Sequence, residues 1–512
     1  MCGILFVDDS NKTFTKSHLS SALHRQTWRG PDNTGEAIFN EGRVYLGHNR
    51  LSIIAPEPTA NQPMQTDRYA IIFNGEIYNY KYLQNHLRLE CSLDSDTEVL
   101  LRGFEMIGVS IFPLLEGMFA LVIYDKLKNT WHVARDHAGI KPLFYHQTKQ
   151  LTVFASEPSA INNLISSSID YSSIEEWKLV RRPAIGYTFF EDIFEFPCAS
   201  YKSSYDSNPT KYWSPSESSV LLTTESYSRE IASAVNSHLV GDCAYTTLLS
   251  GGLDSAVITK IANPSMAYTV GLDTNNEFSE AYDTAVVVGC DLKQVCITID
   301  QLNENWKYLT QLRGEPLSLP NEALIYEVCR ATQPEQKIIL SGEGADETLL
   351  GYSRIFEWAD NISDFTPVDF LLRYGYCNKI HEPKLGRLID YIIKLKDGKT
   401  PFEFVEDFFL GFHLPCLLRR MDFASMAASK EVRVPFVSKR LISLCYRQNV
   451  ELRMGKNYIN PKKPLRELSR NLGLVGASRR KKIGFEASSH RSTPKSVSYS
   501  AFQSSTLSHF LK

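Results

Sequence analysis

The chain has 512 residues, of which 43% are hydrophobic and 22% are charged, and its formal net charge is −3. These values are ordinary for a folded protein, and the length predicts two or three folded units rather than one core. The nearly balanced charge provides no general basic field for nucleic acid or an anionic membrane, so we expect small metabolites as ligands.

The first residues contain a candidate nucleophile. The chain begins Met1-Cys2-Gly3-Ile4, and removal of Met1 would leave Cys2 with both a thiol and a free α-amine. An ionised thiol is a strong nucleophile, and the amine can accept its proton. Taken alone, Cys2 has the alternative of an ordinary second residue, because no spacing rule makes a lone cysteine catalytic.

The remaining signals near the N-terminus favour a cytoplasmic protein. Residues 6–10 are acidic where a signal peptide would be basic, and no apolar run approaches the roughly 20 residues that span a bilayer. The ten cysteines are scattered without a Cys-x-x-Cys pair, which argues against a disulfide framework or a structural zinc site. We therefore expect no membrane partner and no nucleic-acid partner.

The first part of the chain predicts an antiparallel sheet system. Short apolar runs at residues 69–73, 118–124 and 151–155 are each followed by turn-forming or polar residues, a pattern typical of such strands. This pattern predicts a first domain over residues 1–210, with helices beside its sheets.

The second part has a different pattern. After a serine-rich and proline-punctuated stretch at 203–219, buried strands at 244–249 and 337–340 each run into a glycine-rich loop. Alternating strands and helices predict an α/β domain with a parallel sheet and with ligands at the strand C-termini. Beyond residue 367 the apolar spacing is mostly helical, so we expect a second domain over residues 220–512 with a helical extension.

The loop Ser250-Gly251-Gly252-Leu253-Asp254-Ser255 is the most specific motif of the second domain. Between a strand and a helix it would direct N–H groups and a helix dipole at an anion, while Asp254 could hold Mg²⁺. It lacks the Gly-Lys-Ser/Thr of the P-loop, and it resembles the pyrophosphate loop of ATP pyrophosphatases, which leave AMP on their substrate. A plain glycine-rich turn is the alternative.

Cys2 and this loop, in this order, resemble the glutamine-dependent asparagine synthetase family over nearly the whole chain. In the first half the resemblance extends to several motifs of a class II glutaminase, a domain with the N-terminal-nucleophile fold. These motifs are Arg29-Gly30-Pro31-Asp32, His48-Asn49-Arg50-Leu51-Ser52-Ile53, Phe73-Asn74-Gly75-Glu76-Ile77-Tyr78-Asn79, Ser95-Asp96-Thr97-Glu98 and residues 135–143.

The resemblance implies roles for residues of the first domain. Cys2 would attack the glutamine amide, and Asn74 with the N–H of Gly75 would form the oxyanion hole. The substrate's α-carboxylate and α-amino group would be held by charged side chains, namely Arg50 for the carboxylate and Glu76 and Asp96 for the amine. Each of these charges alone would more often be a solvated surface group.

In the second domain the resemblance implies a site for ATP and Mg²⁺. Glu343 would be the base that takes a proton from attacking ammonia, and Lys482, within a late Lys-x-Gly-Phe motif, would stabilise charge on the adenylate. A solvated basic run is the alternative for Lys482. The residues implied for ATP are Leu248, Ser250, Gly251, Gly252, Asp254, Ser255, Val270, Ser341 and Gly342, and those implied for the metal are Asp254 and Asp346.

Several positions depart from the family pattern. Trp28 stands where histidine is usual, Cys198-Ala199 replaces Pro-Gly, and Lys430 replaces an apolar residue. Val437-Ser438 replaces Leu-Asp, and residues 314–322 in the acceptor region also differ. These departures leave glutamine hydrolysis and ATP use intact but put the acceptor in doubt.

The resemblance therefore implies ATP- and glutamine-dependent amidation of a carboxylate through an acyl-adenylate, with aspartate giving asparagine as the default. Another carboxylate, such as a uronic acid of a polysaccharide or a secondary-metabolite acid, is an alternative within this class. Two alternatives belong to other function classes. An N-terminal-nucleophile amidohydrolase with a vestigial second half is disfavoured by the intact loops, and a ligand sensor would require lost catalytic groups. The oligomeric state, including a homodimer, stays open.

Overall fold

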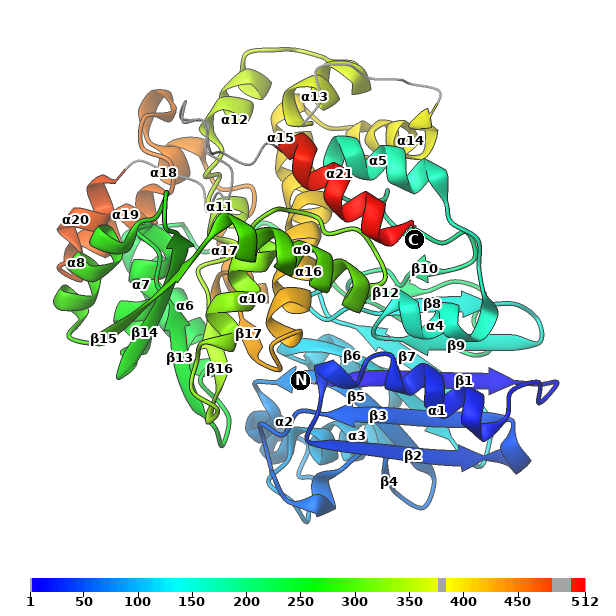
Figure 1. Ribbon diagram of the computed structural model, residues 1–512. Coiled ribbons are helices and arrows are strands. Elements are labelled where there is room, and N and C mark those ends of the chain that lie inside the picture. Colours follow the sequence, from blue (N-terminus) through cyan, green and yellow to red (C-terminus); the bar gives the residue numbers. More distant parts are fainter. Residues whose placement is uncertain (1, 376–383, 481–498, 512) are drawn as a thin grey trace. The chain divides into compact units, whose positions relative to one another are not determined.

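The computed structural model describes residues 2–375, 384–480 and 499–511 (Figure 1). Contacts divide the chain into two compact units. Unit 1 comprises Met1–Tyr171, Gly186–Ser214 and Val240–Cys243, and unit 2 comprises Ser172–Ile185, Pro215–Leu239 and Ala244–Lys512. None of the helices in the described ranges is long and apolar enough to cross a membrane.

Unit 1 contains, among its described residues, two six-stranded sheets in which neighbouring strands run antiparallel. The first sheet has the order β10 (Phe194–Glu195), β8 (Phe144–Gln147), β9 (Leu151–Ala155), β1 (Gly3–Asp9), β3 (Val44–Arg50) and β2 (Asn33–Phe39). The second has the order β12 (Thr210–Lys211), β11 (Ser200–Ser203), β7 (Thr130–Arg135), β6 (Gly117–Asp125), β5 (Tyr69–Ile77) and β4 (Met64–Gln65). The antiparallel system predicted for the first half is confirmed.

The two sheets share one apolar core. It includes Ile4 and Phe6 of β1, Ile72 of β5 and Val122 of β6. Helices α1 (Lys16–His24) and α4 (Pro158–Ile165) pack on the first sheet, and α3 (Asp96–Ile107), beside α2 (Tyr80–His86), packs on β5. Because both faces of β5 and β6 are covered, these strands are buried along their whole length, whereas edge strand β2 alternates half-buried and exposed residues.

Unit 2 contains a five-stranded sheet in its described residues, and all its strand pairs are parallel. The order is β15 (Asp291–Ile297), β14 (Met266–Leu272), β13 (Ala244–Leu248), β16 (Gln336–Leu340) and β17 (Glu431–Arg433). This confirms the predicted parallel sheet. The chain proceeds from β13 towards one edge and from β16 towards the other, so the neighbouring C-terminal ends of β13 and β16 flank a crevice suited to a ligand.

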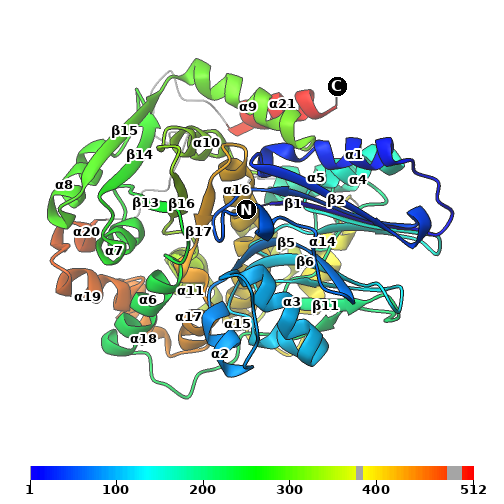
Figure 2. The same cartoon turned by 90° about the horizontal axis from the view of Figure 1, so that it is seen from below.

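Helices cover both faces of this sheet (Figure 2). The connections after β13 and β14 contain α7 (Leu253–Ala262) and α8 (Phe278–Val288), which pack on one face. The reversal of strand order places α10 (Glu322–Arg330) and α16 (Leu414–Met426) on the other face, because parallel crossovers are right-handed.

The other helices of unit 2 include the predicted helical extension. The core of this helical extension is rich in aromatic side chains, among them Phe370, Phe404 and Phe408. Leu179 and Val180 of α5 also belong to this core. These helices are α5 (Tyr171–Val180), α6 (Thr224–Ser237), α9 (Ile299–Arg313), α11 (Ala345–Thr348), α12 (Ser353–Asp360), α13 (Pro367–Tyr374), α14 (Gly386–Lys396), α15 (Pro401–Phe408), α17 (Lys439–Cys445), α18 (Val450–Met454), α19 (Lys463–Asn471), α20 (Val475–Arg479) and α21 (Tyr499–Phe510).

Lys430 has a structural role that the sequence did not indicate. Its buried ammonium donates to the carbonyl oxygens of Gln333, Pro334 and Gln336, at 2.6, 3.3 and 3.1 Å. These carbonyls lie at the start of β16, the end of the sheet opposite to the glycine-rich loops. The Lys430 side chain therefore links the starts of β16 and β17. Its departure from the family pattern gives no reason to expect a different acceptor.

We expect Lys430→Met to lower the free energy of unfolding by about 1–3 kcal/mol, because three carbonyl groups lose a charged donor while the side-chain volume is nearly kept. Denaturant unfolding measures the change, with Lys307→Met at an exposed position of α9 as the control. Equal stability of the two variants would contradict the role given to Lys430.

Candidate active site

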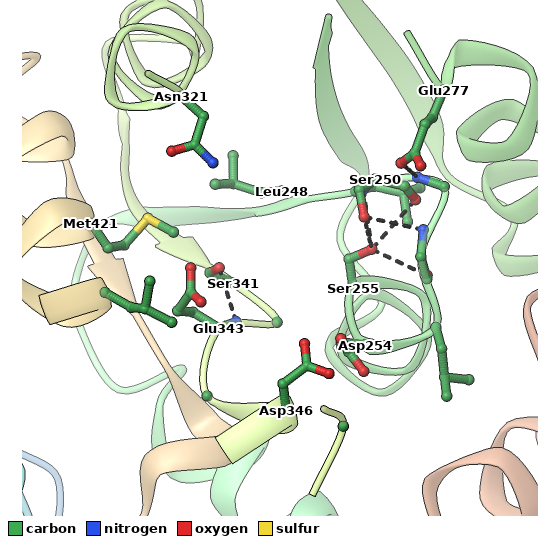
Figure 3. Close-up of a pocket in the computed structure, with 18 of the residues that line it drawn as sticks. Leu248, Ser250, Asp254, Ser255, Glu277, Asn321, Ser341, Glu343, Asp346 and Met421 are labelled. Carbon is green, nitrogen blue, oxygen red and sulfur yellow. Dashed lines mark hydrogen bonds between the residues drawn. The ribbon is translucent and has the colours of Figure 1, made fainter. Parts of the chain in front are cut away.

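A cavity of about 570 Å³ in unit 2 lies at the C-terminal ends of β13 and β16 (Figure 3). Every described residue that the sequence implied for ATP, for the metal or as the synthetase base lines it. These residues are Leu248, Ser250, Gly251, Gly252, Asp254, Ser255, Val270, Ser341, Gly342, Glu343 and Asp346. Lys482 lies outside the described residues.

The loop after β13 is held in shape by its own hydroxyl groups. The backbone N–H of Ser250 donates to Ser255 Oγ at 3.1 Å, and the two side-chain oxygens lie 2.9 Å apart. The N–H of Gly252, the residue before α7, donates to Ser250 Oγ at 3.1 Å. The loop thus places the N-terminus of α7, with its partial positive charge, at the cavity wall.

The loop after β16 packs directly against the first loop. A Cβ atom on Gly342 would lie 2.8 Å from the backbone nitrogen of Ser255 and 2.9 Å from the carbonyl carbon of Asp254. Only glycine permits this approach. As a result, Asp254 and Asp346 point toward one another across the two loops (Figure 3).

Lys462 joins these two carboxylates, and the sequence analysis missed it. Its Nζ lies 2.8 and 2.7 Å from the two carboxylate oxygens of Asp254 and 2.6 Å from Asp346 Oδ1. Burial opposes the charge of Lys462, yet the two carboxylates outweigh burial and raise its pKa above the ordinary lysine value. No local motif signals this contact, because Lys462 and Asp254 are 208 residues apart.

The same two carboxylates fit a divalent cation. Their oxygens converge on one cationic atom, and carboxylate oxygens are ligands that Mg²⁺ prefers. The described residues offer no group of three or more His, Cys, Asp or Glu side chains that could hold a metal. Further ligands would therefore have to be phosphate or water oxygens, as is common for Mg²⁺ at nucleotide sites.

Glu277 is a second residue that the sequence analysis missed. Its Oε2 accepts the N–H of Gly251 in the glycine-rich loop at 3.0 Å (Figure 3). Burial raises the pKa of Glu277, and this hydrogen bond opposes the rise by stabilising the charged form. An internal carboxylate thus occupies a backbone donor of the kind that binds phosphate.

The predicted base, Glu343, is paired with Arg420. A guanidinium nitrogen of Arg420 contacts the Glu343 carboxylate, and the other donates to Asn321 Oδ1 at 3.3 Å. Both Arg420 and Asn321 line the cavity and are buried. The sequence analysis assigned neither of them, although Asn321 falls in the divergent segment 314–322.

The acidic residues of that segment pair with an arginine and do not line the cavity. Glu315 and Glu322 are fully buried and lie 3.5 and 3.3 Å from guanidinium nitrogens of Arg313. Leu319 and Asn321 are the residues through which the segment reaches the cavity wall.

In unit 1, Cys2 is buried beside Asn74 of β5. The backbone nitrogen of Cys2 donates to Asn74 Oδ1 at 3.0 Å, while Asn74 Nδ2 is buried without a hydrogen-bond partner among the described residues. Gly75 has a φ of +154°, and a Cβ there would overlap the carbonyl oxygen of Met118 on β6. The position after Asn74 therefore accepts only glycine.

The other predicted glutamine-binding residues also belong to unit 1. Asp96, the first residue of α3, accepts the backbone N–H groups of Ile77 and Thr97 at 3.1 and 2.8 Å. Glu76, within β5, is buried. Asp96 is therefore anchored beside the strand that carries Asn74 and Glu76.

Arg50 lies at the end of β3. The β1–β3 register pairs Gly3 with Asn49, so Cys2 and Arg50 lie at the same end of this strand pair. The guanidinium of Arg50 is buried in the loop that follows. There it donates to the Asn61 side chain at 2.7 Å and to the backbone carbonyls of Ile54, Ala55 and Glu57. These contacts fix its position and occupy part of its donor capacity.

Arg29, part of a motif in the sequence, holds the first strand in place. Its Nε donates to the carbonyl oxygen of Cys2 at 3.0 Å, and its Nη1 lies 2.6 Å from Glu157 Oε1. The Arg29–Glu157 pair is buried. The Trp28 ring, at the position that departs from the family pattern, packs 5.5 Å from this guanidinium.

Comparison with known proteins agrees with this two-part architecture. A family model described as a glutamine amidotransferase domain matches residues 1–213, and a model described as asparagine synthase matches residues 227–509. Together the two matches define a glutamine amidotransferase coupled to a synthetase. The chain belongs to the asparagine synthase family, as the resemblance predicted.

Named relatives are distant. Glutamine-hydrolysing asparagine synthetase 3 of Bacillus subtilis is 28% identical, over 89% of this chain and 82% of the relative. Asparagine synthetase 1 of the same organism is 30% identical over 69% and 59%, and a putative asparagine synthetase of Mycobacterium tuberculosis H37Rv is 29% identical over 66% and 57%. The last two alignments span less than two thirds of the relatives' length.

We expect Arg29→Met to destabilise unit 1 by about 3–5 kcal/mol, because it leaves the buried Glu157 carboxylate without its cation. Arg29→Met combined with Glu157→Gln should recover part of this loss, since the unpaired charge is removed. The unfolding free energies of the wild type, Arg29→Met, Glu157→Gln and the double variant complete a double-mutant cycle. Arg25→Met at an exposed neighbouring position is the control, and strict additivity would contradict the coupling.

Proposed function

We propose that this enzyme amidates a carboxylate through an acyl-adenylate, using ATP and glutamine-derived ammonia. The observation that carries the proposal is the meeting of two loops in one cavity. It brings a phosphate-type loop, the Asp254–Asp346 pair and Glu343 within one ligand-sized space. A vestigial second half would not be expected to keep this arrangement, so the synthetase is favoured over a plain amidohydrolase.

In unit 1 the proposed reaction is attack of the Cys2 thiolate on the amide of glutamine, with release of ammonia and later hydrolysis of the thioester. Asn74 Nδ2, a buried donor without a partner among the described residues, is suited to the oxyanion of the tetrahedral intermediate. A fixed donor of this kind contributes roughly 3–4 kcal/mol in the transition state. Arg50, Glu76 and Asp96 are the proposed partners of the α-carboxylate and α-amino groups of glutamine.

In unit 2 the proposed reaction begins with attack of the acceptor carboxylate on the α-phosphorus of ATP, which expels pyrophosphate. The N-terminus of α7, with the side chains of Ser250 and Ser255, is the proposed contact for the phosphate oxygens. Leu248 and Val270 are the proposed adenine contacts. A Mg²⁺ ion held by Asp254 and Asp346 would offset the charge of the phosphates.

Glu343 is the proposed base for the second step. Ammonia attacks the acyl carbon, AMP leaves, and the carboxylate takes one proton from the nitrogen. The ion pair with Arg420 holds the Glu343 carboxylate in place at the cavity wall. Lys482, outside the described residues, remains the proposed partner of charge on the adenylate.

Aspartate is the acceptor that we propose, because the named relatives are asparagine synthetases. With Lys430 assigned to a structural role, the divergent segment 314–322 is the remaining reason to consider another carboxylate. Arg420 and Asn321 are the polar residues most relevant to the choice of acceptor. Both line the cavity, and Arg420 contacts Glu343 and donates to Asn321.

An acceptor screen tests the proposed function. With glutamine, ATP and Mg²⁺ present, we expect aspartate to stimulate pyrophosphate release in amounts that equal the asparagine formed. Uronic acids and other small carboxylic acids form the comparison set. Stimulation by another acid and not by aspartate would replace the acceptor, whereas no stimulation by any acid beside normal glutamine hydrolysis would reject the synthetase.

We expect Cys2→Ala to lose glutamine-dependent amide formation by several orders of magnitude, because a methyl group cannot form the thioester. The variant should still form product with ammonium chloride, since ammonia enters after that step. Raising the pH towards 8–9 should help, because more of the ammonium becomes unprotonated ammonia.

Product formation by one preparation, first with glutamine and then with ammonium chloride, makes this measurement. Cys91→Ala, at another cysteine of unit 1, is the matched control and should retain glutamine use. Undiminished synthesis from glutamine by Cys2→Ala would overturn the assignment of the nucleophile.

A further inference from the structure

The pair of carboxylates that suits a metal ion already binds a side chain of the protein. Lys462 Nζ contacts both oxygens of Asp254 and Oδ1 of Asp346, at 2.8, 2.7 and 2.6 Å. Three carboxylate oxygens from two separate segments therefore surround one ammonium nitrogen. These are the oxygens that a divalent cation in this place would need.

The surrounding structure is built for this contact. A Cβ atom on Gly351 would overlap Asp346 Oδ1 and lie 2.6 Å from Lys462 Cε, so glycine is required where the two side chains meet. Lys462 has a left-handed backbone, with a φ of +59°, immediately before α19. It is only 6% exposed. A non-glycine residue held in this conformation and buried is fixed by its environment rather than placed by chance.

The charges of the cluster show why the contact matters. Two carboxylates with one ammonium leave a net charge of about −1, whereas a divalent cation in the same place would neutralise the pair. Lys462 and the cation cannot use the same oxygens together, because two positive charges would then lie within a few ångströms of one another. Binding of the metal at Asp254 and Asp346 therefore requires the ammonium to move.

We propose that Lys462 is a resident counter-cation of the nucleotide site, which a divalent metal must displace in order to bind Asp254 and Asp346. The cost of breaking the Lys462 contacts weakens the binding of the metal alone. A nucleoside triphosphate supplies both oxygen ligands for the metal and negative charge for the displaced ammonium. Metal and nucleotide therefore favour each other's binding. This inference rests on the proposed function only in taking the cavity as a site for metal and nucleotide.

Binding of Mn²⁺, measured from the free-ion electron paramagnetic resonance signal without nucleotide, tests the proposal. Lys462→Met should bind Mn²⁺ about tenfold tighter or more than the wild type, because it keeps the length of the side chain and removes the competing charge. The control is Lys463→Met, which changes a neighbouring lysine that does not line the cavity and should bind like the wild type.

A second substitution shows where the gain arises. Lys462→Met combined with Asp346→Asn should lose the gain, since one of the two carboxylates is removed. Lys462→Gln provides an alternative if Lys462→Met does not fold. Should neither variant fold, the wild type decides: a tight stoichiometric Mn²⁺ site without nucleotide overturns the proposal, and its absence is the expected result.

Unchanged Mn²⁺ affinity in folded Lys462→Met, or a gain that persists after Asp346→Asn, would also overturn it. The titration contains no glutamine, acceptor or nucleotide, so its result does not depend on amide formation. Failure of the proposed function would instead appear in the acceptor screen as absence of pyrophosphate release.

Discussion

The close contact between the loop after β13 and the loop after β16 is the constraint on which the cavity of unit 2 depends. The two strands are sheet neighbours at the point where the strand order reverses, so their C-terminal loops emerge side by side. Glycine at position 342 lets the backbones touch. A larger residue there would push the loops apart and carry Asp254 away from Asp346, with the loss of the paired carboxylates.

Unit 1 depends on a different constraint, the fixed position of the start of β1. The start of β1 is held from two sides, since Asn74 accepts the N–H of Cys2 and Arg29 donates to its carbonyl. Both partners are fully buried, and Arg29 is compensated by Glu157. Residues near the start of a chain usually move freely, and these buried contacts hold Cys2 in one position.

The sequence predicted what is encoded locally. Turn residues after apolar runs revealed the antiparallel strands, and glycine-rich loops after buried strands revealed the cavity-lining segments, because each pattern lies within a few adjacent residues. Lys462 and Arg420 escaped prediction since their partners are 208 and 77 residues away. Glu277 lies closer to Gly251, but nothing in its local pattern distinguishes it from a surface acid.

Lys430 shows a different limit of the sequence. A charged residue where an apolar one is usual suggested a change in the ligand site, but the long side chain reaches three carbonyl groups at the far end of the sheet. Burial of a lysine depends on which acceptors lie within reach, and that depends on how the loop at residues 333–336 folds. The roles given to Cys2, Arg50 and Glu343 rest on family resemblance, and the structure supplies their surroundings.

The early position of α5 in the chain has a consequence for biosynthesis. This helix is made between two segments of unit 1, yet the indole of Trp177 donates to the carbonyl of Leu317, 140 residues later. Leu179 and Val180 pack with residues as late as Met454. On the ribosome, the apolar side of α5 therefore stays exposed while most of unit 2 is still being translated. At rates of roughly 5–20 residues per second, the nascent chain exposes this aggregation-prone helix for tens of seconds.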